Sequence, residues 1–175
     1  MSMNFSEFAI IGGYYDIIDE SGTNDVEVIS LSKTSILSVK PEIPSLKMNM
    51  SRFGGAQLPN GDLLVAGGYD GYGPYNDKYL YLKNSSKEWT EVGTMKRTRK
   101  EHSTVFIGGS MFSCGGSLGY KAISHHESFS LNGEVNELKA LPIVLKQHTA
   151  TIISQNEILV CGGRSKDVSP LSLIL

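Results

Sequence analysis

The stretch Leu63-Leu64-Val65-Ala66-Gly67-Gly68 decides the fold of this chain, because a short apolar run that ends in a glycine pair occurs four times along the sequence. The other three copies are Phe8-Ala9-Ile10-Ile11-Gly12-Gly13, Met111-Phe112-Ser113-Cys114-Gly115-Gly116 and Ile158-Leu159-Val160-Cys161-Gly162-Gly163. The first glycines of successive pairs lie 55, 48 and 47 residues apart. The chain is therefore predicted to be an internal repeat.

The rest of each period also follows one plan. A polar or aromatic loop comes after the glycine pair, then an alternating strand such as Lys78–Leu82, a turn, and a further strand that begins near Ile36, Trp89 or Val135. Four strands in each period match one blade of a β-propeller. A period of about 50 residues is too long for ankyrin or tetratricopeptide units. We expect the apolar run to be the second strand of each blade, covered on both faces by neighbouring blades.

The sequence resembles the kelch repeat family. The resemblance rests on the apolar strand before Gly-Gly, on Tyr81 and Phe129 in the third strand, and on the spacing of Trp89, Met95 and Arg99. It implies an all-β fold, a partial kelch β-propeller of four-stranded antiparallel blades. The whole chain, 1–175, then forms one kelch-repeat domain. Its approximate blades are 5–50, 51–99, 100–146 and an incomplete 147–175.

Composition and charge favour no special environment. The chain has 16 Lys and Arg against 18 Asp and Glu, so no overall field would attract nucleic acid or an anionic membrane. The beginning of the sequence lacks the pattern of a secretory signal, and we expect a soluble cytoplasmic protein. Cys114 and Cys161 occupy equivalent positions before Gly-Gly and are interpreted as small buried apolar residues.

Several candidate sites are better explained by the repeat. His102 and His148 are 46 residues apart, at the same place in successive repeats, so we favour a structural role over metal binding. No Gly-Lys-Ser/Thr follows any glycine cluster, which argues against a phosphate-binding loop. We therefore expect no cofactor and no metal. The basic run Lys96-Arg97-Thr98-Arg99-Lys100 could be a basic patch or an import signal. Because it coincides with the link between blades, we favour a structural or rim role.

One rim of the propeller is the candidate functional site. The loops after the glycine pairs vary most, and they should emerge on the same face as the links that carry Arg52, Arg97, Arg99 and Lys146. That rim gathers residue types enriched at protein interfaces. The alternative is that these loops are simply solvated. The predicted partner-binding residues are Tyr14, Tyr15, Asp16, Tyr69, Asp70, Tyr72, Tyr75, Arg97, Arg99, Tyr120 and Arg164.

The leading functional hypothesis is a protein–protein interaction module and not an enzyme. The family resemblance implies substrate recruitment for a ubiquitin ligase or actin binding, and the ligase role would need further domains. The alternatives are a fragment of a galactose-oxidase-like or sugar-isomerase-like propeller enzyme, and an inactive fragment. Because three and a half blades leave open sheet edges, self-association to complete a ring is a further hypothesis.

Overall fold

The computed structural model describes residues 6–14, 22–31, 36–39 and 43–165. Within these ranges the chain forms strands, turns and loops and contains no helix. The predicted all-β fold is confirmed. No segment of the described ranges is a helix of the length and apolar character that crossing a membrane requires.

The two central repeats form complete four-stranded antiparallel sheets, which we call blades two and three. Blade two has the order β4-β5-β6-β7, and blade three has the order β8-β9-β12-β13. The strands of blade two are β4 (Gly54–Gln57), β5 (Leu63–Ala66), β6 (Lys78–Leu82) and β7 (Thr90–Thr94). Those of blade three are β8 (Ser103–Ile107), β9 (Ser110–Cys114), β12 (His126–Ser130) and β13 (Val135–Glu137). The prediction of four strands per blade is confirmed here.

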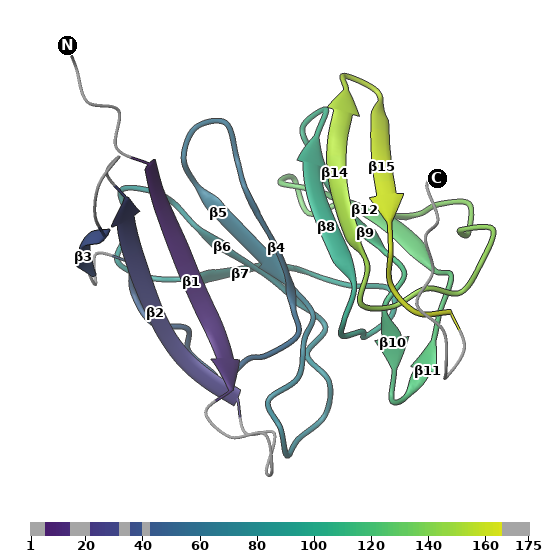
Figure 1. Ribbon diagram of the computed structural model, residues 1–175, viewed down its shortest axis with the longest axis horizontal. Coiled ribbons are helices and arrows are strands. Elements are labelled where there is room, and N and C mark those ends of the chain that lie inside the picture. Colours follow the sequence, from purple (N-terminus) through teal and green to yellow (C-terminus); the bar gives the residue numbers. More distant parts are fainter. Residues whose placement is uncertain (1–5, 15–21, 32–35, 40–42, 166–175) are drawn as a thin grey trace.

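The two outer repeats contribute smaller sheets. Blade one is the three-stranded sheet β1-β2-β3, made of β1 (Ser6–Tyr14), β2 (Gly22–Leu31) and β3 (Ile36–Val39). Blade four is the hairpin of β14 (Thr149–Ser154) and β15 (Glu157–Cys161). A two-residue pair, β10 (Ser117–Leu118) with β11 (Lys121–Ala122), stands in the loop after β9. Figure 1 shows the sheets in chain order along an arc that does not close.

The first strands of successive blades pack on one another along the inner side of the arc. Strand β8 contacts both β4 and β14. The Thr104 hydroxyl of β8 donates a hydrogen bond of 2.8 Å to the carbonyl of Gly55 in β4. Gly54 leaves the room that this approach needs, because a Cβ there would lie 2.3 Å from the Thr104 methyl group. Close packing of inner strands therefore joins each blade to the next.

The glycine pair has a defined task in this packing, which is clearest at Gly115 and Gly116. Their φ angles are +57° and +100°, in the region that favours glycine. A Cβ on Gly115 would lie 2.5 Å from the Leu145 carbonyl in the link to the next blade, and one on Gly116 would lie 2.7 Å from the Lys100 carbonyl in the link into its own blade. The first glycine thus admits the next blade, and the second admits the link that leads into its own.

Candidate functional site

The links between blades place three residues in an unusual backbone conformation. Arg52, Glu101 and Gln147 have φ angles of +54°, +59° and +56°, although none is glycine. They occupy the same position in successive repeats and are joined by hydrogen bonds, from the Glu101 amide to the Arg52 carbonyl at 2.7 Å and from the Gln147 amide to the Glu101 carbonyl at 2.9 Å. Such conformations cost of order 1–3 kcal/mol each and need support from their surroundings. The links therefore form a continuous chain along the rim.

Glu101 is the centre of a polar cluster at this rim. Its carboxylate accepts hydrogen bonds of 2.9 Å from the Gln147 amide group and from the Ser117 hydroxyl. Arg52 Nη1 lies 3.6 Å from one carboxylate oxygen, and Lys146 Nζ lies 3.8 Å from the other. Four side chains from three successive repeats thus meet one acidic group. A small cavity of about 220 Å³ is lined by Arg52, Phe53, Glu101, His102, Gln147 and His148.

The loop after β5 is held in shape by its own polar side chains. The Asp70 carboxylate accepts hydrogen bonds from the amides of Tyr72 at 3.0 Å and Gly73 at 2.6 Å, which is the geometry of an Asx turn. The Tyr69 hydroxyl donates to the Gly71 carbonyl at 2.6 Å. This scaffold presents the Tyr72 side chain to solvent, where 75% of its surface is exposed.

The loop after β9 is a short hairpin. Strands β10 and β11 pair Leu118 with Lys121, and Gly119, with a φ of +62°, makes the tight turn between them. The turn leaves Tyr120 86% exposed and Leu118 51% exposed. Lys146 Nζ donates to the Tyr120 carbonyl at 3.0 Å, which ties the hairpin to the next link.

Lys100 joins the two loops. Its Nζ lies 4.6 Å from the ring centre of Tyr69, 5.2 Å from that of Tyr75 and 5.8 Å from that of Tyr120. These distances are within the range of cation–π attraction, about 6 Å. Burial, with smaller contributions from Tyr69 and Tyr120, raises the pKa of Tyr75, so its phenol stays neutral at physiological pH. We call Lys100 with Tyr69, Tyr75 and Tyr120 the tyrosine cluster.

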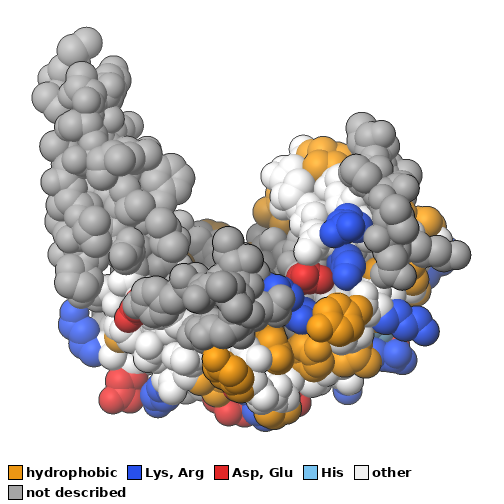
Figure 2. All heavy atoms as spheres, turned by 60° about the horizontal axis from the view of Figure 1, so that its bottom comes forward, with side chains coloured by type: hydrophobic (Ala, Val, Ile, Leu, Met, Phe, Trp, Pro, Cys, Tyr) orange, Lys and Arg blue, Asp and Glu red, His pale blue; other side chains and the backbone are white. Residues whose placement is uncertain are grey.

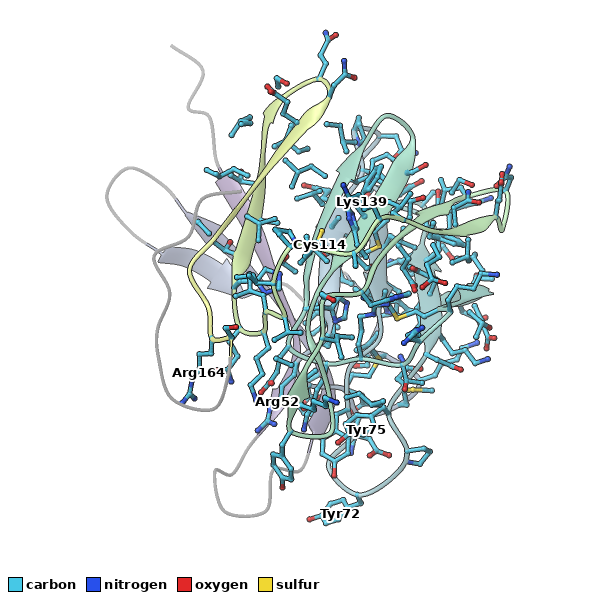
Figure 3. The ribbon with its side chains drawn as sticks, turned by 90° about the vertical axis from the view of Figure 1, so that its right-hand side faces the viewer. Arg52, Tyr72, Tyr75, Cys114, Lys139 and Arg164 are labelled. Atoms are coloured by element: carbon cyan, nitrogen blue, oxygen red, sulfur yellow. The ribbon has the colours of Figure 1, made fainter. Side chains whose placement is uncertain are left out.

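The structure brings most of the predicted residues of blades two to four to one rim. Tyr69, Tyr75 and Tyr120 meet in the tyrosine cluster, and Asp70 and Tyr72 lie in the loop that carries the first two. Arg164 is exposed and pairs through its backbone with Lys146. Figure 3 shows Arg52, Tyr72, Tyr75 and Arg164 toward the lower end of the molecule, below Cys114 and Lys139. Figure 2 brings this end forward and shows hydrophobic side chains, tyrosine included, beside basic ones.

The prediction that Arg99 lies on the surface of the rim is wrong. Its side chain is fully buried, and Nη2 lies 2.9 Å from the Glu127 carboxylate, which is also fully buried. Nη1 donates to the carbonyls of Gly115 at 3.2 Å and His125 at 2.9 Å. A guanidinium can be buried only where its donors find partners, and Arg99 finds them in blade three. Arg99 is therefore part of the interior of blade three.

Arg97 lies apart from the tyrosine cluster. Its side chain is exposed and its Nη2 lies 3.8 Å from Glu137 in β13. Of the predicted residues in blade one, Tyr14 ends β1 and pairs with Gly22. Tyr15 and Asp16 lie outside the described residues.

Glu101 was not singled out by the sequence analysis, and Lys100 was considered only as part of the run 96–100. Both lie between Arg99 and His102, in a stretch that was assigned to the link between blades. The equivalent positions hold Ser51 and Arg52 in one repeat and Lys146 and Gln147 in another. The change of charge from repeat to repeat at these positions is the signal that could have drawn attention to them.

The histidines of the links are buried. Burial lowers the pKa of His102 to about 3, and the nearby Arg99 charge acts in the same direction. Burial also lowers the pKa of His148. Among the residues that the structure describes, no three His, Cys, Asp or Glu side chains are grouped as they would be around a metal ion.

The sequence was compared with protein-family models and with curated proteins, and neither comparison finds a match.

Proposed function

We propose that this protein is an interaction module that binds a protein partner through the rim around the tyrosine cluster. Tyrosine and arginine are the residue types that dominate binding energy at protein interfaces, since they add large contact areas and directed hydrogen bonds. The rim carries Tyr72 and Tyr120 as its most exposed aromatic side chains. These two side chains are the proposed anchors.

The observation that carries the proposal is the organisation of the rim before any partner binds. Lys100 holds rings from two different loops, and Asp70 holds the backbone of one of them. A surface that is already ordered loses less conformational entropy when a partner binds. Exposed aromatic groups on an ordered support therefore favour binding over simple solvation of the loops.

The partner proposed here is a protein segment with both polar and apolar groups. The rim offers tyrosine rings next to charges of both signs. Arg52, Lys146 and Arg164 are positive, and Glu101 and Asp70 are negative. The resemblance to kelch repeats supports two more specific proposals, recruitment of a ubiquitin-ligase substrate and binding to the cytoskeleton. We also propose a cytoplasmic location, with which the free thiols of Cys114 and Cys161 are compatible.

The proposal is tested with a variant that removes both anchors, Tyr72→Ala with Tyr120→Ala. The wild-type chain and the variant are used as bait, and the captured proteins are identified and their affinities measured with purified components. A Leu131→Ala variant is the matched control, because Leu131 is also an exposed apolar side chain, at 41% exposure. It lies in the turn between β12 and β13, away from the proposed anchors.

We expect a partner that binds wild type and Leu131→Ala with equal affinity and binds the double variant at least about 30-fold more weakly, which corresponds to about 2 kcal/mol. Equal binding by all three proteins would contradict the proposal. A melting temperature close to that of wild type shows that the double variant is folded.

A further inference from the structure

Among the described residues, the sheet of blade one has no counterpart of the strand that lies at the inner edge of the two complete sheets. In blade two the glycine-pair strand β5 lies between β4 and β6, and in blade three β9 lies between β8 and β12. The equivalent strand of blade one, β1, lies at the edge of its sheet and pairs only with β2 among the described residues. An edge strand presents unpaired backbone donors and acceptors along one side.

The inner strand of blade two, β4, has one exposed face, on the side of blade one. Strand β8 is covered by β4 and by β14, and its residues are buried or half-buried. In β4, Gly54 and Ala56 are buried or half-buried, whereas Gly55 and Gln57 are exposed. Alternate residues of a strand point to opposite faces, and Gly54 faces His102 and Thr104 of blade three. Gly55 and Gln57 therefore belong to the face turned toward blade one.

A cavity of about 710 Å³ lies at this place. Blade one contributes Ile11 and Gly13 to its lining, and blade two contributes Gly55, Gln57 and Leu63, among others. Its volume is within the range of ligand sites in proteins, about 300–1,000 Å³. The cavity, the edge of β1 and the exposed face of β4 adjoin one another. We call this place the strand cleft.

We propose that the strand cleft binds an extended segment of another polypeptide, which pairs antiparallel with β1 and covers β4. The two complete blades show what fills the equivalent position. Gly54 lies opposite Ala66, and Ser103 lies opposite Cys114, each partner being the residue before a glycine pair. The bound segment pairs in the same register, its first residue opposite Ile11 and its next three opposite Ile10, Ala9 and Phe8.

The chemistry of the bound segment follows from its surroundings. Backbone hydrogen bonds to β1 supply affinity without regard to sequence, as in other cases of β-strand addition. The side chains that face β4 meet Gly55, which has no side chain, and the neutral Gln57, whereas the basic Arg52 and Lys87 line other parts of the cavity. Uncharged β-branched and aromatic residues fit beside Gly55 and Gln57. Ser103–Ile107, with the sequence Ser-Thr-Val-Phe-Ile, is the natural model because it pairs with β9, the strand of blade three that is equivalent to β1.

The test measures binding of a fluorescent peptide to the full chain. The peptide has the sequence of residues 102–108, and its fluorescence anisotropy is followed as protein is added. We expect saturable binding that weakens at least about tenfold when the peptide carries Val105→Pro, because proline cannot donate to the strand ladder. We expect a similar loss when the protein carries Gly55→Leu, which fills the cleft. A Cβ at Gly55 meets no atom closer than 3.4 Å, so this variant is expected to fold.

The matched control is Thr151→Leu, an added leucine on the exposed strand β14, which should bind the peptide as wild type does. No saturable binding, or equal binding after Val105→Pro in the peptide or Gly55→Leu in the protein, would overturn the proposal. Alternate amides of residues 8–11 already bond to β2, so hydrogen exchange at the other amides of this stretch, which point away from β2, tests the other occupants in the protein without peptide. Protection at every protein concentration would assign the cleft to this chain itself. Protection that grows with protein concentration would assign it to a second copy. Either result would also overturn the proposal.

Discussion

Blades two and three use the same backbone positions for opposite chemistry. The position before the link holds Met50 at the entry to blade two and Arg99 at the entry to blade three. In blade two Val65 lies opposite Leu80, and all three residues belong to one buried apolar cluster. The equivalent residues of blade three are Ser113, opposite Glu127, and Arg99. An apolar set in one blade is thus replaced by a polar set in the next.

The two charged members of the polar set, Arg99 and Glu127, are stable in the interior because each finds partners there. The Glu127 carboxylate lies 2.9 Å from Arg99, accepts a hydrogen bond of 2.8 Å from the Tyr79 hydroxyl and lies 3.2 Å from a ring nitrogen of His125. Burial and the neighbouring carboxylate strongly raise the pKa of Tyr79, so it remains a hydrogen-bond donor. The comparison teaches that this fold accepts either chemistry at these positions, provided that the whole set changes together.

The largest effect is expected when this set is broken at one member. Arg99→Met introduces the residue that stands at the equivalent position, Met50, but leaves the buried Glu127 without its cation. Because an uncompensated buried charge is costly, we expect the free energy of unfolding to fall by about 3–5 kcal/mol, measured by urea denaturation at pH 7. The double variant Arg99→Met with Glu127→Leu recreates the pair of Met50 and Leu80 in blade two and should recover part of the loss. Recovery is incomplete because the buried Tyr79 hydroxyl loses its acceptor.

A double variant as unstable as Arg99→Met alone would contradict the equivalence of the two sets. In that case the polar network would stabilise blade three through further contacts, such as the Arg99 hydrogen bonds to the carbonyls of Gly115 and His125.

A smaller effect is expected at the glycine pairs, which both blades share. Gly115→Ala places a Cβ 2.5 Å from the Leu145 carbonyl at a φ of +57°. The strained φ and the collision together should lower the stability by about 2–5 kcal/mol, measured by thermal unfolding. Gly108→Ala is the matched control, because its φ is +59° and nothing lies within 4 Å of an added Cβ. It should lose only the backbone part, about 1–2 kcal/mol. Equal losses would show that close approach of the next blade is not the reason for the first glycine.

The effect that is smallest at neutral pH, and develops only as the pH falls, concerns the residue after the left-handed link position, which is Phe53 in blade two and His102 in blade three. Burial lowers the pKa of His102 to about 3 from its usual 6.5, so the unfolded chain binds this proton more tightly than the folded one. Stability should therefore fall as the pH drops from 6.5 toward 3, by up to about 1.4 kcal/mol per pH unit from this residue.

The variant His102→Phe copies blade two and should flatten the dependence of unfolding free energy on pH. A smaller slope should remain, because burial also lowers the pKa values of His125, His126 and His148. Urea midpoints measured at several pH values between 4 and 7 provide the test. An unchanged slope would mean that His102 is not the dominant titrating group.

The sequence was sufficient to predict the strands and their order. An apolar run, a glycine pair and an alternating strand are local patterns, and their repetition determined which strands of different blades are equivalent. The same regularity predicted that the loops after the glycine pairs face one rim, and Tyr69, Tyr75 and Tyr120 do meet there. It could not predict that Arg99 turns inward, because the partner that makes this possible lies 28 residues away.

The repeat period, the blade strands and the sites that require glycine are thus properties that the sequence by itself determined, since each depends on neighbours along the chain. The tertiary structure alone decided which polar side chains are buried, how Lys100 gathers tyrosines from two loops, and that one edge of β1 has no partner strand in the part of the chain that the structure describes. The physical reason is that burial, charge pairing and open edges depend on segments that are distant in sequence and meet only when the blades pack.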